Sequence, residues 1–394
     1  MADANEPILR IRKNLGRVLG AGHPWVYRDA LDAFDLPPGT PVQVHDKKGA
    51  FVARGFTESG AIGVRIFTTR DEPLGHSFFE RRFKAAFGLR QALVASDDTT
   101  VYRLCHGEGD RLPGIALDHY GAEEGDFVVL RLDGEAAPSL EAMLVEVLTP
   151  ILKKRGTLGL LSRIGRSGQA PRLAWGEAPP DQVKVRECGM VLCADLWRGQ
   201  KTGLFLDHRE SRKRVRSLAK GRRVLNLYAY TGGFSVAAGL GGASHVTTVD
   251  VAPAAIALSE ASWAANDLKP GRHTALARDV RTHMEQDSQM YELIVSDPPS
   301  FAPNEKSVEK ALGAYEQLHA SCLKRLLPGG IFVAASCSSH VRGADFDETI
   351  AKGASRAGRV LQVLHRGSAP PDHPRLLAFP EGDYLDVVVA RSLG

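Results

Sequence analysis

The stretch VLNLYAYTGGFSVAA (224–238) decides the fold, because a short apolar run leads directly into a turn with paired glycines. Apolar runs of strand length recur after it, separated by segments long enough for helices: VTTVDV (246–251), YELIVSD (291–297), IFVAAS (331–336), VLQVLH (360–365) and YLDVVVAR (384–391). Alternating strands and helices are typical of a doubly wound α/β sheet. We therefore predict a Rossmann-like fold for this half of the chain.

Length and composition indicate several folded domains. The chain has 394 residues, of which 43% are apolar and 24% are charged, and one domain usually takes about 100 to 200 residues. No apolar run reaches the about 18 residues that a membrane-spanning helix needs. The N-terminus also lacks the charged start and apolar stretch of a secretion signal. We therefore expect a multidomain cytoplasmic protein that does not enter a membrane.

The residues before the predicted sheet form two further segments. Short β-type runs separated by Gly, Pro and Asp turns fill the first 70 residues and indicate a small barrel-like domain. Helical patterns at 77–93 and 139–155 enclose strand-like runs at 114–120 and 126–132, which together indicate an α+β unit. We predict domains at 1–72, 73–190 and 191–394. The helix at 77–93 carries an apolar stripe that favours core packing over base stacking: Phe78, Phe79, Phe83 and Phe87.

The cysteines do not indicate a disulfide framework or a metal site. They are odd in number, no pair is spaced as Cys-x-x-Cys, and no histidine cluster has the spacing of a zinc site. We therefore expect no bound metal.

Two runs are rich in basic residues, although the formal net charge is only +4. The first lies near the N-terminus and includes Arg10, Arg12 and Lys13, and the second covers residues 209–223. Such a run is either a solvated helix face or a surface that contacts phosphates. The second interpretation predicts that the protein binds RNA.

The loops after the first strands of the sheet are the first places to look for a cofactor. The loop YTGGF (230–234) lacks the Gly-x-Gly-x-x-Gly pattern of a dinucleotide site, whereas a short turn around Gly232 suits the methionine part of S-adenosylmethionine, which carries no phosphate. Asp250 ends the second strand, where its carboxylate can accept hydrogen bonds from both ribose hydroxyls. Asp279 lies where the adenine amino group is expected, and it is equally suited to cap a helix.

The apolar run YELIVSD (291–297) leads into the loop DPPSF (297–301). Two consecutive prolines restrict the backbone and remove two N–H donors, so the loop is rigid. A rigid loop of this kind can hold a flat base, with Asp297 accepting a hydrogen bond from it. This pattern favours a methyltransferase over a proline turn that only ends a strand.

Several of these segments resemble the bacterial 23S rRNA methyltransferase family of the large-subunit methyltransferase I type. The resemblance rests on GQKTGLFLDHRESR (199–212), VLNLYAYTGGFSVAA (224–238), DPPSFA (297–302) and SCSS (336–339), and it extends to GHPWVYRDAL (22–31), YRLCHGEGDRLPGIALDHYG (102–121) and DHPRLLAFPEGDYL (372–385). It implies a PUA domain, a central α+β domain and a class I, Rossmann-fold methyltransferase. This methyltransferase would make 5-methylcytidine in 23S rRNA with S-adenosylmethionine as cofactor.

The resemblance also implies roles for particular residues. The expected cofactor-binding residues are Gln200, Lys201, Phe205, Asp207, Arg209, Asn226, Tyr228, Gly232, Asp250, Asp279 and Asp297. The rigid loop and the basic run near the N-terminus, and not the resemblance, supply the expected RNA-binding residues, which are Pro298, Pro299 and Phe301 with Arg10, Arg12 and Lys13. Asp297 and Cys337 are the expected catalytic residues.

The chemistry gives an independent reason to expect a catalytic cysteine. Carbon 5 of cytosine is a weak nucleophile, and a thiolate that adds to carbon 6 makes it enamine-like. Cys337 lies at the carboxyl end of an apolar strand and is suitably placed, although a buried cysteine can also serve only in packing.

Other functions remain open at this stage. The 5-methylcytidine family commonly has Asp-Gln-Arg where this chain has Asp207-His208-Arg209, and Asp-His-Arg resembles a related 7-methylguanosine branch. Nitrogen 7 of guanine is already nucleophilic and needs no cysteine. A non-catalytic RNA-binding assembly factor and, more distantly, an NAD-dependent oxidoreductase are further alternatives. The sequence leaves open whether the chain forms a homodimer.

Overall fold

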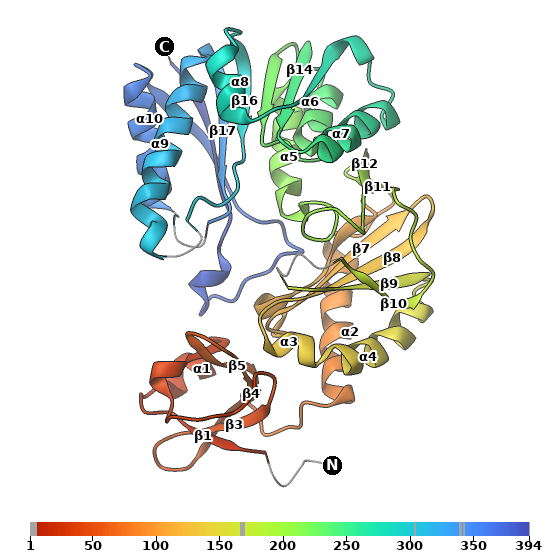
Figure 1. Cartoon of the computed structure of the whole chain (residues 1–394), viewed down its shortest axis with the longest axis vertical. Coiled ribbons are helices and arrows are strands. Elements are labelled where there is room, and N and C mark those ends of the chain that lie inside the picture. Colours follow the sequence, from red (N-terminus) through yellow and green to blue (C-terminus); the bar gives the residue numbers. More distant parts are fainter. Residues whose placement is uncertain (1–5, 166–169, 303–304, 339–340, 342, 394) are drawn as a thin grey trace. The chain divides into compact units, whose positions relative to one another are not determined.

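A computed structural model of the chain describes residues 6–165, 170–302, 305–338, 341 and 343–393. The chain divides into two compact units. The first, here called the N-terminal unit, comprises Met1–Val183, Asp195–Gly203 and Pro371–Gly382, and the second, the C-terminal unit, comprises Lys184–Ala194, Leu204–Pro370 and Asp383–Gly394. Figure 1 shows the elements of each unit along the chain.

The N-terminal unit begins with a five-stranded sheet in the order β1-β3-β4-β5-β2. Its elements are β1 (Ile8–Arg10), α1 (Gly16–Gly20), β2 (Trp25–Tyr27), β3 (Pro41–His45), β4 (Phe51–Thr57) and β5 (Ile62–Thr68). Strand β1 is parallel to β3, and the other pairs are antiparallel. Alternate residues of β3, Val42 and Val44, are fully buried, so one face of the sheet builds a small apolar core.

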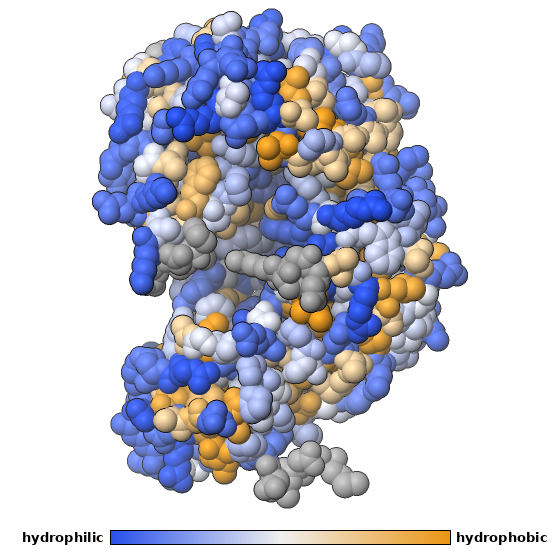
Figure 2. All heavy atoms as spheres, in the orientation of Figure 1, coloured by the Kyte–Doolittle hydropathy of each residue, from blue (hydrophilic) through white to orange (hydrophobic). Residues whose placement is uncertain are grey.

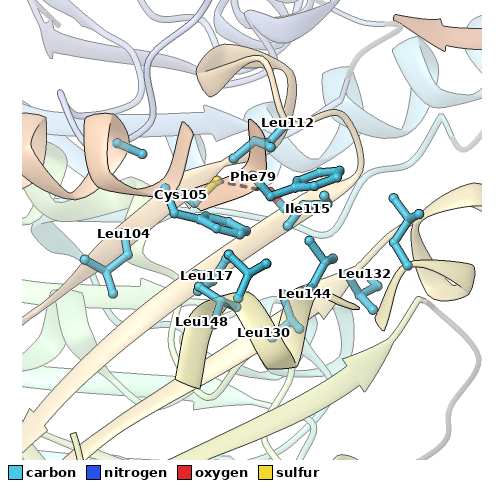
Figure 3. Close-up of a cluster of buried hydrophobic side chains, with 14 of the residues drawn as sticks. Phe79, Leu104, Cys105, Leu112, Ile115, Leu117, Leu130, Leu132, Leu144 and Leu148 are labelled. Carbon is cyan, nitrogen blue, oxygen red and sulfur yellow. Dashed lines mark hydrogen bonds between the residues drawn. The ribbon is translucent and has the colours of Figure 1, made fainter. Parts of the chain in front are cut away.

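A second sheet follows in the same unit, with strands β10-β9-β8-β7 side by side and β6 paired with β7. Its elements are α2 (His76–Leu93), β6 (Val101–His106), β7 (Ile115–Ala122), β8 (Gly125–Leu132), α3 (Ala136–Ser139), α4 (Glu141–Lys154), β9 (Gly159–Ile164) and β10 (Arg172–Gly176). Helices α2 and α4 pack against one face of this sheet, and leucines of both layers meet there (Figure 3). The phenylalanine stripe of α2 lies in this core, as predicted: Phe78, Phe79, Phe83 and Phe87 are at most 4% exposed.

The C-terminal unit contains a seven-stranded sheet in the order β15-β14-β13-β16-β17-β19-β18. The strands are β13 (Arg223–Leu227), β14 (His245–Asp250), β15 (His273–Ala277), β16 (Tyr291–Ser296), β17 (Leu326–Ser336), β18 (Leu361–Gly367) and β19 (Asp386–Ser392). All neighbours are parallel except β19, which is antiparallel to both β17 and β18. The predicted doubly wound α/β sheet is confirmed. Strand order reverses at β13, and ligands bind at such a point in open α/β sheets.

Helices cover both faces of this sheet (Figure 1). They are α5 (Arg209–Leu218), α6 (Gly233–Leu240) and α7 (Pro253–Ala265) on one face, and α8 (Val280–Gln286), α9 (Val308–Lys324) and α10 (Ala344–Arg356) on the other. Side chains alternate between the two layers: in β16, Leu293 and Val295 pack toward α5–α7, and Ile294 packs toward α8–α10. Hydrophilic residues cover much of the outer surface of α9 and α10 (Figure 2).

Strand β15 was not anticipated from the sequence. It lies at the edge of the sheet, and each of its five residues is exposed or only partly buried. An edge strand of this kind needs no continuous apolar run, so its pattern, HTALA, is weak.

Three segments depart from a simple division of the chain into consecutive domains. The hairpin of β11 (Val183–Glu187) and β12 (Met190–Ala194) is bound to α7, because the Cys193 N–H donates to Ser262 Oγ at 2.9 Å. Residues 195–203 are held in the N-terminal unit by the Thr202 hydroxyl, which donates to buried Asp118 at 2.6 Å. Residues 371–382 are held there by Asp372, whose carboxylate accepts the Arg103 N–H at 3.0 Å.

The remaining short elements are single 3-10 turns: η1 (Arg28–Ala30), η2 (Gly107–Asp110), η3 (Leu206–His208), η4 (Pro270–Arg272), η5 (Glu305–Ser307) and η6 (Pro380–Gly382). In the described part of the chain no helix is long and apolar enough to cross a membrane.

Candidate active site

The turn after β13 has an unusual backbone. Tyr228, Tyr230 and Gly232 have φ angles of 55°, 47° and 73°. Positive φ is rare for bulky residues other than glycine, and such strained positions cluster at functional sites. The turn is therefore shaped at some energetic cost immediately before α6 begins.

Gly232 is required by packing within the protein. A Cβ atom at this position would lie 2.0 Å from the Ser259 Oγ atom of α7, and the residue also has positive φ. The sequence suggested that this glycine allows the backbone to approach a ligand, but the close approach in the structure is to α7. Its contact with a cofactor stays a prediction.

Asp250 connects two of the loops at the carboxyl edge of the sheet. One carboxylate oxygen accepts the Tyr230 N–H at 2.7 Å, and the other accepts the Ala252 N–H at 2.9 Å. Each oxygen has a second lone pair, so the half-buried carboxylate can also accept a pair of ligand hydroxyls. The neighbouring Val251 is 69% exposed and offers an apolar surface for a flat ring. These groups fit the ribose and adenine parts of S-adenosylmethionine.

Asn226 lies below this edge and not in it. Its side chain has no exposed surface, and its Nδ2 donates to Ser235 Oγ of α6 at 2.8 Å. Ser235 is in turn hydrogen-bonded to Thr248 of β14 at 2.7 Å. The Asn226 side chain therefore links β13 to α6, and its contact with the cofactor stays a prediction.

Asp279 caps α8. Its carboxylate accepts the Thr282 N–H at 2.9 Å, and this hydrogen bond lowers the pKa of the carboxyl group. The side chain is exposed at the end of β15, which lies two strands from β13 in the sheet. The helix-cap interpretation is confirmed, and a role in binding adenine stays a prediction.

His208 and Asp297 meet at the start of the loop after β16. His208 Nε2 lies 3.1 Å from Asp297 Oδ2, and its ring packs edge-on against Phe234 with centroids 5.4 Å apart. His208 is only 2% exposed, whereas Asp297 is half-buried. The sequence did not predict this contact. Its only signal was the histidine that replaces glutamine in the Asp-Gln-Arg pattern.

The residue before His208 is also held in place. Asp207 is buried and accepts a hydrogen bond from the Tyr384 hydroxyl at 2.9 Å. Tyr384 lies two residues before β19, so a segment distant in the sequence fixes the turn η3.

Cys337 directly follows β17 and is half-buried. Strands β16 and β17 are parallel neighbours, with Ser296 paired to Ala334, so Asp297 and Cys337 leave the sheet at the same edge. Tyr315 of α9 contacts residues near both of these positions. Its ring centre lies 4.8 Å from that of Phe301, and its hydroxyl is 3.2 Å from Ser336 Oγ.

Tyr315 was not predicted from the sequence. Burial raises the pKa of its phenol to about 12, and Cys337 and Asp297 are among the nearby groups that raise it further. The phenol therefore stays neutral near pH 7. A neutral hydroxyl leaves Asp297 and Cys337 without an additional negative neighbour.

Other predicted cofactor residues occupy varied positions. Phe205 packs edge-on against Tyr230, with ring centres 5.2 Å apart, so both belong to the turn after β13. Tyr228 is half-buried, and burial raises its pKa. Arg209 is buried at the first position of α5. Gln200 and Lys201 belong to the N-terminal unit, and their role stays a prediction.

The loop residues predicted to contact RNA differ in exposure. Pro298 is buried, Pro299 is exposed, and Phe301 is half-buried against Tyr315. Pro298 therefore supports the loop from below, while Pro299 is accessible to a substrate.

The basic residues near the N-terminus are exposed, but some already have partners. Arg12 forms an ion pair with Asp32 at 3.0 Å, and Lys13 forms one with Asp29 at 2.6 Å. Arg10 is exposed on β1. Their contact with RNA stays a prediction.

The predicted phosphate-contacting surface at residues 209–223 does not include Arg209 and Arg212, and phosphate contact by its exposed basic residues stays a prediction. Arg212 is buried, and its guanidinium donates to both oxygens of buried Glu187 at 2.6 Å. Arg209 is buried as well, whereas Lys213 and Arg214 are exposed. The run is amphipathic, because α5 packs one of its faces into the unit.

Comparison with known proteins places these features in a family. A family of S-adenosylmethionine-dependent methyltransferases matches residues 156–380, and a PUA-like domain family matches residues 9–81. The ribosomal RNA large subunit methyltransferase I of Tolumonas auensis is 33% identical over 97% of this chain and 98% of its own length. The ribosomal RNA large subunit methyltransferase of Deinococcus radiodurans is 34% identical over 96% of each chain. The crystal structure of SMU.776 complexed with SAH is 26% identical, has a TM-score of 0.88, and covers 98% of this chain and 100% of that chain.

The sheet order and the strand-end loops are those of an S-adenosylmethionine-dependent methyltransferase. The chain belongs to this family, and within it to the proteins of the ribosomal RNA large subunit methyltransferase I type. Its cofactor is S-adenosylmethionine. In the described residues no group of three or more His, Cys, Asp or Glu side chains is arranged to hold a metal ion.

Proposed function

We propose that this protein methylates carbon 5 of a cytosine in large-subunit ribosomal RNA through a covalent adduct on Cys337. The observation that carries the proposal is the position of Cys337, directly after β17 and at the same edge of the sheet as Asp297. Its relatives in Tolumonas auensis and Deinococcus radiodurans are named ribosomal RNA large subunit methyltransferases, which supports an RNA substrate.

The cofactor would be held at the carboxyl edge of β13 and β14. Asp250 would accept hydrogen bonds from the ribose hydroxyls, and Val251 would contact the adenine ring. The turn of Tyr228 to Gly232 would enclose the methionine part. When bound there, S-adenosylmethionine supplies an electrophilic methyl group.

The target base would lie against the rigid loop after β16. Asp297, held by His208, would accept a hydrogen bond from the exocyclic amine of cytosine, and Pro299 would contact its ring. The loop leaves no backbone N–H at Pro298 or Pro299, so its polar contacts with the base come from carbonyl oxygens and from Asp297.

Cys337 supplies the nucleophile. Its thiolate would add to carbon 6 of the cytosine, and the electron pair of the carbon 5–carbon 6 double bond would form the new bond from carbon 5 to the methyl group. The sulfur–methyl bond of the cofactor breaks in this transfer, and S-adenosylhomocysteine is the leaving group. A base then removes the proton from carbon 5, the double bond forms again, and the sulfur–carbon 6 bond breaks. The thiolate of Cys337 is restored, and the proton from carbon 5 remains on the base.

The adduct itself can be trapped. RNA with 5-fluorocytidine at the target should form a stable covalent complex in the presence of S-adenosylmethionine, because fluorine does not leave as a proton does. Denaturing gel electrophoresis should show one shifted band, and peptide mass spectrometry should place the RNA on Cys337. Methylation of ordinary RNA without any trapped complex would contradict the cysteine mechanism.

A second candidate is methylation of nitrogen 7 of guanosine, which the histidine at position 208 favours. Nitrogen 7 carries a lone pair, so this reaction needs Asp297 and His208 but no thiolate. Nucleoside mass spectrometry of rRNA from a strain that lacks the protein separates the two candidates, since either 5-methylcytidine or 7-methylguanosine will be depleted.

A further inference from the structure

An arginine cluster in the N-terminal unit lies outside the methyltransferase site. Arg70 follows β5, Arg81 and Arg82 lie on α2, and Arg111 ends η2. Arg111, Arg81 and Arg70 each lower the pKa of Arg82 electrostatically, so the charges interact although they come from three elements.

The acidic residues around this cluster are already paired. Glu72 accepts a hydrogen bond from Arg81 at 2.6 Å and one from the Thr68 hydroxyl at 2.9 Å. The other acids next to these arginines in sequence pair elsewhere, as Asp71 with Arg54, Glu80 with Lys84, Glu108 with Arg65, and Asp110 with Arg90. Among the described residues, no ion pair contains Arg70, Arg82 or Arg111. The carboxylate of Glu72, which is paired with Arg81, partly offsets the charges of Arg82 and Arg111.

The uncompensated charge is partly removed from water. The Arg82 Nε atom is buried and has no hydrogen-bond partner in the described structure, and the guanidinium lies over the ring of buried Phe78 at 5.2 Å. Burial and the neighbouring arginines lower the pKa of Arg82 to about 10 and also lower that of Arg111. Like charges placed in this way repel one another, and an anion bound beside them would offset the repulsion.

The local shape is suited to such an anion. Arg111 adopts the left-handed conformation, with φ of 59°, next to fully buried Leu112, so its direction is set by the backbone. It lines a surface hollow together with Thr69 and His23. Guanidinium groups match phosphate oxygens with paired hydrogen bonds, and arginine is preferred wherever phosphates are recognised.

We propose that Arg70, Arg82 and Arg111 form a binding site for backbone phosphates of the substrate RNA. The proposal rests on the proposed function in that RNA is the substrate, but it concerns binding and not methyl transfer. The proposed RNA contact lies on α2 and η2 and not on the five-stranded sheet. Its arginines form no ion pair in the described structure, whereas Arg12 and Lys13 each form one.

The test measures RNA binding by the full-length chain as a function of salt. The site variant is Arg70→Gln/Arg82→Gln/Arg111→Gln, and the probe is a fluorescent polyuridine oligonucleotide, which contains no methylatable cytosine. The matched control is Arg281→Gln/Lys352→Gln/Arg356→Gln. It removes the same charge from exposed side chains that are paired with Glu285, Glu348 and Glu316.

Loss of three phosphate contacts should reduce the slope of log affinity against log salt by about 2, because each contact with a single strand contributes about 0.7. The control should keep the slope of the unchanged protein. Equal slopes for the site variant and the control would overturn the proposal. Affinity for S-adenosylmethionine should be the same in all three proteins.

A single variant and a competition experiment with pyrophosphate complete the test. If the triple variant does not fold, the exposed single variant Arg70→Gln should lower the slope by about 0.7, and an unchanged slope would overturn the proposal. Inorganic pyrophosphate serves as a small competitor. Saturable pyrophosphate binding that disappears in the site variant, with RNA binding unaffected, would assign the site to a free phosphate ligand. The unchanged protein could also prove to make no 5-methylcytidine while the site variant still shows the reduced salt slope. That result would refute the proposed function but not this binding site.

Discussion

His208 Nε2 lies 3.1 Å from Asp297 Oδ2, which joins the turn before α5 to the loop after β16. The other ring nitrogen of His208, Nδ1, is buried and has no hydrogen-bond partner in the described part of the chain. The carboxylate of Asp297 is therefore the polar group with which the imidazole of His208 interacts. A side chain so placed can orient Asp297 and fix which of its lone pairs face a substrate.

Two amide variants separate this positioning role from simple packing. The Nε2 of glutamine can reach the place of the histidine Nε2, whereas the shorter asparagine cannot. His208→Gln should therefore retain most activity, and His208→Asn should lower kcat about 10- to 100-fold, equivalent to the about 1.5–3 kcal/mol of a hydrogen bond to a charged group. Steady-state kinetics and thermal unfolding of both variants provide the comparison. Equal losses in the two would show that the ring only packs.

Cofactor binding should depend on Asp250. Asp250→Ala is expected to weaken S-adenosylmethionine binding by about 1–3 kcal/mol in calorimetry, because ligand hydroxyls lose their acceptor. Asp279→Ser provides a second measurement, since serine also caps helices but lacks a carboxylate. The free energy of unfolding of the Asp279→Ser variant should equal that of the unchanged protein. A lower cofactor affinity in Asp279→Ser would support contact with adenine, and an unchanged affinity would limit Asp279 to the cap it forms with Thr282.

The two cysteines of the C-terminal half should behave differently. Cys337→Ala should abolish methylation and the 5-fluorocytidine adduct while cofactor affinity is kept, because the thiol acts on the base. Cys322 is fully buried in α9, and burial raises its pKa to about 12, so it holds no thiolate near pH 7. Cys322→Ala should retain methylation at a modest loss of stability. Near-normal turnover in Cys337→Ala would favour a ring nitrogen as the methyl acceptor.

The Arg212–Glu187 pair should contribute to stability and not to RNA binding. Removing one partner of a buried ion pair costs about 3–5 kcal/mol, so Arg212→Leu should lower the unfolding midpoint in urea. Arg214→Leu, at an exposed position of the same helix, should change stability by about 0.5 kcal/mol at most. The double variant Arg212→Leu/Glu187→Leu should recover part of the loss, because no charge remains buried. Similar midpoints for the two single variants would contradict this role.

Acid should destabilise the C-terminal unit through its buried histidines. Burial lowers the pKa of His273 from 6.5 to about 4 and that of His319 from 6.5 to about 3. Below pH 6.5 the unfolded chain takes up protons that the folded chain does not, so stability is complete above this pH and falls as the pH decreases toward 4, by about 1.4 kcal/mol per unit of pKa difference for each group.

His319→Leu tests the larger of these shifts. His319 is wholly buried among the rings of Tyr315, Phe332 and Phe346, so leucine should be accommodated there. Unfolding midpoints measured between pH 4 and pH 7 should vary less with pH in the variant. An identical pH dependence would mean that His319 does not cause the acid sensitivity.

Local patterns in the sequence predicted much of the fold. The phenylalanine stripe of α2 and the apolar runs of β13, β14, β16 and β17 predicted buried elements, because burial on one face of a helix or on both faces of a strand demands such periodicity. Asp250, the last residue of β14, and Asp297, the first residue after β16, were found in the same way. Parallel strands bring their carboxyl ends to one edge, so the position of each acid in its own strand was sufficient.

What the sequence by itself determined was therefore the class of sheet, its strand-end loops and the candidate groups on them. Only the tertiary structure decided which partners these groups have. In the folded chain Asn226 is hydrogen-bonded to Ser235 of α6, and Arg212 is paired with Glu187. Gly232 packs against Ser259, and His208 contacts Asp297. The physical reason is that each of these contacts joins segments separated in the chain, and their geometry depends on how helices and strands pack together and not on any pattern within one segment.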